Sequence, residues 1–106
     1  MAAKLTLNPK PTFKHTVMIP VPGEKPHPVE FTFHGKTQKQ YGEMLEQMTK
    51  ADGDEAASFM LFVAGWDVAA DFTKENVEQF LQSYIGAGTL LFREFTDELT
   101  KAARGN

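Results

Sequence analysis

One stretch, Gly65 to Leu99, most constrains how this chain can fold, because residue types mark its helix boundaries. Thr73 can cap a helix, since its hydroxyl accepts a hydrogen bond from a free backbone N–H of the first turn. Gly86 stands where glycine most easily ends a helix in a left-handed conformation. Between them, apolar residues recur on one helix face: Val77, Phe80, Leu81, Tyr84 and Ile85. The stretch therefore predicts a tight turn, a helix, a glycine break and a final helix.

The same stretch supplies the predicted structural anchors. Trp66, the only tryptophan, fits a core position in which its indole N–H finds a hydrogen-bond acceptor. Thr73 and Gly86 fix the ends of the first helix, and Gly88 allows a second bend. An apolar stripe follows in the final helix: Leu91, Phe95 and Leu99.

Two segments of alternating residues precede the helices. One side of the first segment is formed by Phe13, His15, Val17, Ile19 and Val21. Val29, Phe31 and Phe33 alternate with polar residues in the second segment, and Pro22-Gly23 lies between the two as a turn signal. Pro20 cannot donate a ladder hydrogen bond, which favours an edge position. The pattern predicts an antiparallel β-hairpin whose apolar face is covered by helices or by another subunit.

Two further helices are predicted between the hairpin and this stretch. Thr37 and Gln40 have the spacing of a capping box, which places a helix at about 38–50. Asp54 can cap another helix from about Glu55 to Ala64. A buried strand at Phe59–Val63 competes with that helix, because a short apolar run does not settle the choice.

The predicted fold class is therefore α+β, with an N-terminal antiparallel β-hairpin followed by about four α-helices packed as a small bundle. Residues 1–12 contain Asn8, Pro9 and Pro11 and are predicted to form a flexible arm. Residues 13–106 are predicted to form a single domain, a size that supports a real core.

Composition argues against several functions. The 106 residues include no cysteine, which removes thiolate chemistry and cysteine metal sites, and the formal net charge of −3 argues against nucleic acid as main partner. No run approaches the ~20 apolar residues of a membrane helix, so we expect no membrane partner and a soluble, intracellular protein. His15, His27 and His34 are not expected to converge on a metal. No phosphate-binding or nucleophile motif occurs, so neither a cofactor nor an enzyme activity is predicted.

The chain resembles the tail assembly chaperones of long-tailed bacteriophages and prophages. The resemblance is carried by TVMIPVPGEKPHPVEFTF, QKQYGEMLEQM, VAGWDV and DFTKENVEQFLQSYIGAGTLLFREFTDELT, within residues 13–104. It implies a protein without enzymatic activity that binds and solubilises the tape measure protein in the host cytoplasm. It also implies help in recruiting tail tube subunits, and absence from the mature virion. A structural minor component of a phage tail is the alternative, and a small metal-dependent or hydrolytic enzyme is a third.

Two candidate interaction surfaces follow. We expect the hairpin to support association into a homo-oligomer, especially through Val17, Ile19, Phe31 and Phe33. We expect four aromatic residues to border the tape measure site: Phe59, Phe62, Phe92 and Phe95. A plain core position is the stronger interpretation of each residue taken singly.

Overall fold

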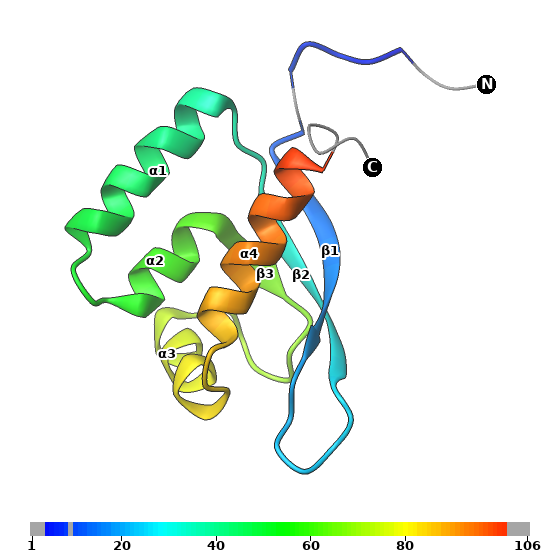
Figure 1. Cartoon of the computed structure of the whole chain (residues 1–106), viewed down its shortest axis with the longest axis vertical. Helices are drawn as coiled ribbons and strands as arrows, with labels where there is room; N and C mark the ends of the chain where they lie inside the picture. The colour runs from blue at the N-terminus through cyan, green and yellow to red at the C-terminus, as the bar shows by residue number, and fades with distance from the viewer. Residues whose placement is uncertain (1–3, 9, 102–106) are drawn as a thin grey trace.

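The computed structural model describes residues 4–8 and 10–101 and shows an α+β fold (Figure 1). The described part contains three strands and four helices. Their bounds are β1 Thr12–Ile19, β2 His27–His34, α1 Gln38–Lys50, α2 Glu55–Phe62, β3 Val63–Trp66, α3 Lys74–Ser83 and α4 Ala87–Thr100. The predicted N-terminal hairpin and the helix at 38–50 are confirmed, and residues 102–106 of the predicted domain lie outside the described residues.

The sheet has the order β1-β2-β3, with both pairs antiparallel. Val17 pairs with Val29 and Phe13 with Phe33, so the apolar sides of the two hairpin strands face the same way. β1 is an edge strand that ends one residue before Pro20, as the missing proline N–H requires.

The predicted helix from Glu55 to Ala64 is wrong in its last two residues, because α2 ends at Phe62 and the chain continues as β3. The predicted tight turn at Gly65 is also wrong, since Gly65 pairs with Thr32 and Trp66 pairs with Phe31. The reason is tertiary: β2 offers a free edge that satisfies the backbone of this segment. The competing strand at Phe59–Val63 is correct for Val63 alone.

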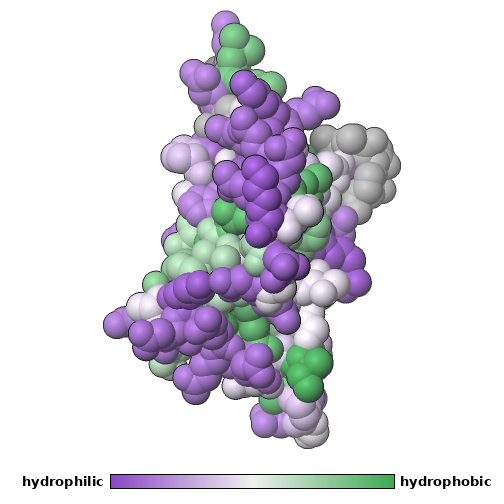
Figure 2. Space-filling view, turned by 90° about the vertical axis from the view of Figure 1, so that its left-hand side faces the viewer, coloured by the Kyte–Doolittle hydropathy of each residue, from purple (hydrophilic) through white to green (hydrophobic). Residues whose placement is uncertain are grey.

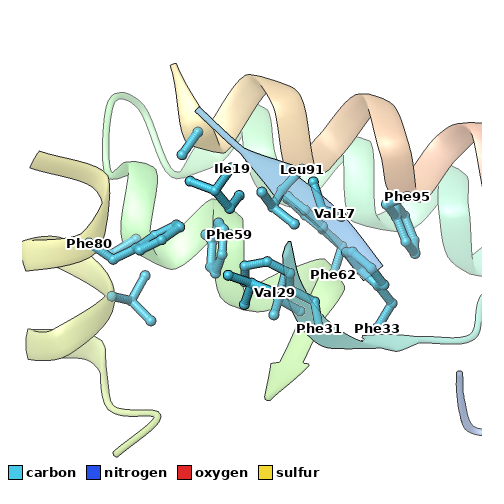
Figure 3. Packing of buried hydrophobic residues seen from close by; sticks show 14 of the residues in the cluster. Val17, Ile19, Val29, Phe31, Phe33, Phe59, Phe62, Phe80, Leu91 and Phe95 are labelled. Carbon is cyan, nitrogen blue, oxygen red and sulfur yellow. The ribbon is translucent and has the colours of Figure 1, made fainter. Parts of the chain in front are cut away.

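The four helices lie on one side of the sheet, and the core fills the space between (Figure 1). Side chains from the strands, α2, α3 and α4 meet there, including Phe31, Phe59 and Leu91 (Figure 3). The largest side chains in the core are phenylalanines, and their rings contact one another in a continuous series: Phe33 with Phe95, Phe95 with Phe62, Phe62 with Phe59, and Phe59 with Phe80. This core fixes the helices against the sheet.

Trp66 is half-buried, and its indole N–H donates a hydrogen bond to the Ala70 carbonyl oxygen at 2.8 Å. Its ring packs on Phe72 and Phe80, with ring centroids 5.2 and 5.4 Å away. Thr73 caps α3 by accepting from the Asn76 N–H at 3.2 Å. Both predicted local contacts are thus present.

Gly86 adopts the predicted left-handed conformation, with φ of 86°, but its predicted place at the end of α3 is wrong: Tyr84 is the C-cap of α3, and Gly86 is the N-cap of α4. The predicted helix face is wrong at Ile85, because α3 already ends at Ser83 and Ile85 is 96% exposed. The predicted bend at Gly88 is also wrong: Gly88 lies inside α4, where a Cβ would stand 3.3 Å from Leu81. Its small size lets α4 start close to α3.

Candidate binding surface

The four hairpin residues predicted to support subunit association lie in the core. Val17 and Ile19 are 2% and 3% exposed, and Phe31 and Phe33 are fully buried. Their side chains face the helices, as Figure 3 shows, so they are already covered within one chain. Association through the hairpin stays a prediction.

Three of the four aromatic residues predicted for the partner site meet at one hollow. A groove of about 460 Å³ lies between α1, α2 and the start of α4, and we call it the helix groove. Phe59 and Phe62 form its buried floor, and the half-buried Phe92 forms a wall. The other lining residues are Met48, Gly53, Asp54, Glu55, Ser58, Gly88 and Thr89.

Phe95 does not line the helix groove. It is fully buried behind the groove, with its ring centroid 5.3 Å from that of Phe62 and 6.4 Å from that of Phe92. Phe95 therefore supports the two groove aromatics from below. Substitutions at Phe95 act on the groove through packing.

The surface around the helices is mixed in character. Figure 2 shows a hydrophobic band between two hydrophilic areas on this side of the molecule. α2 contributes apolar residues that are only partly covered, among them Met60 and Leu61. A helix that is apolar nearly all round is either central or touches a partner, and α2 is central with part of its surface open.

Asp54 lies at the mouth of the helix groove, where its carboxylate already has two hydrogen-bond partners. The Asp54 carboxylate accepts from the Ala57 N–H at 3.0 Å and pairs with the Lys74 ammonium at 2.9 Å. These two hydrogen bonds hold the pKa of Asp54 below its ordinary value. Hydrogen bonding to Asp54 in turn raises the pKa of Lys74. Glu55, beside it, is exposed at the same mouth.

The polar part of this groove is not predicted by the sequence. Its pattern predicts Asp54 only as a helix cap and gives Thr89 no role, although both residues line the groove. Met48 of α1 is half-buried and also lines the groove, where its flexible side chain can adapt to a partner. No local pattern marks these three residues as neighbours, since α1, α2 and α4 bring them together.

A second hollow, which we call the hairpin groove, lies at the far end of the hairpin. Its volume is about 340 Å³. It is lined by Ile19, Val21, Glu24, His27, Val29, Asp67, Val68, Ala69, Phe80 and Tyr84. The floor is aliphatic and aromatic, and Glu24 and Asp67 are exposed acidic residues on its border. In the sequence, several of these residues are predicted only as members of strands and turns.

The histidines do not gather. His15 links β1 to α4, with its Nε2 2.9 Å from Glu94 Oε1 and its Nδ1 3.8 Å from Glu98 Oε2. Partial burial and the nearby charge of Lys36 lower the pKa of His34. Within residues 4–8 and 10–101, no group of three or more His, Asp or Glu side chains is placed to hold a metal ion.

A family model described as phage tail assembly chaperone matches residues 1–106. The chain belongs to this phage tail assembly chaperone family. No curated protein and no solved structure gives a significant match. Family membership points to protein partners in tail assembly and to a role other than catalysis. Across the described helices, none combines the length and apolar character needed to span a membrane.

Proposed function

We propose that this chain binds the tape measure protein during phage tail assembly, keeps it soluble and assists formation of the tail tube around it. The family relationship supplies the assembly role. The sequence resemblance suggests the two partners: the tape measure protein as client and the tail tube protein as a further partner. The chain acts by protein–protein contact, as a homo-oligomer in the host cytoplasm, and does not remain in the mature virion.

The helix groove is the observation that carries this proposal. Its aromatic floor and half-buried Met48 and Phe92 offer apolar area at the surface. Its volume of about 460 Å³ falls in the range of ordinary ligand pockets, about 300–1,000 Å³, so it accepts a few side chains of a partner. An amphipathic helix presents such side chains at i, i+3, i+4 and i+7.

Charge at the groove mouth favours a partner with basic residues beside its apolar face. Glu55 is exposed there, and the whole chain carries a formal net charge of −3. Asp54 is already paired with Lys74, which leaves Glu55 as the freer carboxylate. Opposite charges at the rim raise the association rate and fix the orientation of a partner.

The test is a groove-blocking substitution that leaves the core intact. Thr89 is exposed and lines the helix groove, so Thr89→Arg fills the groove without burying a charge. Thr16→Arg places the same side chain on the exposed outer face of the sheet and serves as the matched control. Both variants are co-expressed with the tape measure protein, and folding is checked separately by circular dichroism.

We expect Thr89→Arg to fold normally and to lose most of the soluble tape measure protein, while Thr16→Arg retains it. If both variants solubilise the partner as the unchanged chain does, the helix groove is not the site. Mass spectrometry of purified tails addresses the alternative role. A structural component would be recovered in stoichiometric amounts, whereas a chaperone is absent from finished particles.

A further inference from the structure

The segment that precedes β1 exposes two leucines completely. We call the described residues 4–8 and 10 the arm; within it Leu5 is 98% and Leu7 99% exposed. In an extended chain, residues two positions apart point to the same side, so the two leucines can enter one groove together. Two fully exposed leucines separated by one residue form an apolar patch, and such patches mark interaction sites.

The base of the arm is held against the hairpin. The Gly35 N–H donates to the Pro11 carbonyl oxygen at 2.9 Å, and a Cβ at Gly35 would overlap the Lys10 carbonyl oxygen. Glycine at position 35 therefore lets Lys10 and Pro11 lie close to the end of β2, and beyond this point the arm projects from the body (Figure 1). The base of the arm, at Lys10 and Pro11, is therefore fixed against Gly35.

The hairpin groove is complementary to the arm in chemistry. Residues 1–11 contain Lys4 and Lys10 and no acidic residue. The groove has an apolar floor that includes Ile19 and Val29, and Glu24 and Asp67 stand on its border. A basic segment with two leucines is thus complementary to an apolar hollow with acidic neighbours.

The arm and the hairpin groove lie at opposite ends of the molecule. Thr12 pairs with His34 at the arm end of the hairpin, and Ile19 pairs with His27 at the groove end. Eight strand residues at about 3.3 Å each separate these ends by about 25 Å. In the structure the arm projects from the end of the hairpin opposite the groove, and Leu5 and Leu7 stay exposed, so the groove of the same chain does not hold them (Figure 1).

We propose that the arm of one copy docks in the hairpin groove of a second copy. Such a contact is heterologous, so it joins molecules head to tail into a closed ring or an open chain. Each contact covers a short segment, which makes the association weak and dependent on concentration. The inference gives the homo-oligomer of the proposed function its contact surfaces, and it does not depend on tape measure binding.

Sedimentation velocity of the full chain alone, over a concentration series, measures this contact. The unchanged chain should show a sedimentation coefficient that rises with concentration. Two variants should stay monomeric: the double substitution Leu5→Asp with Leu7→Asp, and Ala69→Arg, which puts a cation into the groove at an exposed position. Leu45→Asp, at another exposed leucine on α1, is the matched control and should behave as the unchanged chain does.

Mixing the two defective variants distinguishes arm-into-groove docking from other contacts. The double-leucine variant keeps its groove, and Ala69→Arg keeps its arm, so the mixture should form one-to-one dimers and nothing larger. The inference is overturned if the unchanged chain is monomeric throughout, if either variant still self-associates, or if the mixture stays monomeric. None of these results bears on Thr89→Arg, because no tape measure protein is present.

Discussion

The helix groove and the hairpin groove differ in what surrounds them. The helix groove lies between three helices and rests on Phe59 and Phe62, two of the most deeply buried rings of the core. The hairpin groove is bordered by the β-turn side of the hairpin and by the irregular residues 67–69. One is framed by regular structure, and the other is framed mostly by loops.

This difference indicates which kind of partner each groove can bind. Helices held by a packed core keep a fixed spacing, so the helix groove matches another helix with regularly spaced side chains. Loops have fewer packed contacts and adapt more easily, so the hairpin groove matches a short extended segment. If this is correct, the helix groove is more rigid than the hairpin groove, and four predictions test that difference in rigidity.

The largest effect is expected at the floor of the helix groove. Phe62 is 2% exposed, and its ring lies 5.3 Å from Phe92 and 5.3 Å from Phe95. Phe62→Ala removes these contacts and leaves a cavity, which should lower the free energy of unfolding by about 3–5 kcal/mol. Urea denaturation measures the loss. Phe92→Ala, at a half-buried wall position, should cost clearly less, and equal losses would contradict a rigid floor.

A smaller effect is expected at the wall of the hairpin groove. Tyr84 is half-buried there, and its ring centroid lies 5.4 Å from that of Phe80. Tyr84→Ala should lower the free energy of unfolding by about 1–2 kcal/mol, since it loses one aromatic contact and part of its buried area. Tyr84→Phe keeps the ring and should retain most of the stability. A loss as large as that of Phe62→Ala would show that the two grooves are equally rigid.

Much of the fold could be predicted from sequence, because local chemistry and periodicity agreed. Thr37 with Gln40 forms the predicted capping box, and α1 begins and ends where the pattern placed it. Alternation correctly put Val17, Phe31 and Phe33 on one face of the hairpin. In these segments each residue choice supports the same local structure.

The wrong predictions concern segments whose structure depends on contacts with residues far away in the sequence. β3 forms because its backbone pairs with β2, whose residues lie about thirty positions earlier, and no pattern within Val63–Trp66 states this. Ile85 fitted the apolar face of a longer helix, yet α3 ends at Ser83, and Ile85 lies in the short connection that leads through the left-handed Gly86 into α4. Periodicity within a segment does not show where a helix stops packing against the core, and it is this packing that stabilises the helix.

The candidate site was only half predictable for a related reason. Aromatic enrichment pointed to Phe59, Phe62 and Phe92, and these do meet at the helix groove. Sequence could not show that Phe95 lies behind the groove, because depth depends on how α2 and α4 pack. Thr89 and Glu55 are ordinary helix residues whose place on the groove follows from that same packing.

A loss of about 1 kcal/mol is expected from Thr73→Ala, because the variant lacks the hydroxyl that accepts from the Asn76 N–H at the start of α3. α3 carries Phe80 and borders the hairpin groove, so the loosened helix should change that groove first. Thr73→Ser keeps the cap and is the control. Amide hydrogen exchange should quicken in α3 and leave α1 unchanged; faster exchange in both helices would mean that the two grooves are coupled.

The smallest effect concerns the ion pair that joins the two regions. Asp54 starts α2 at the mouth of the helix groove, and Lys74 starts α3. The pKa of Asp54 is lowered in the folded chain, so its charge stabilises the fold above the ordinary carboxyl pKa of about 4. That contribution is lost as pH falls through and below this value. The pKa of Lys74 is raised, so its contribution is present at neutral pH and is lost only in strongly alkaline solution.

Asp54→Asn isolates this charge, because asparagine still caps the helix. The variant should unfold at a slightly lower urea concentration than the unchanged chain at pH 7. The two midpoints should converge only well below pH 4, because the lowered pKa of Asp54 keeps its carboxylate ionised below the ordinary value. Since both side chains are about half exposed, the difference at pH 7 should also shrink in high salt. A difference that persists at low pH would assign the effect to helix capping. A large, salt-independent difference would mean that α2 and α3 move as one unit, and the two grooves would then share a common rigid wall.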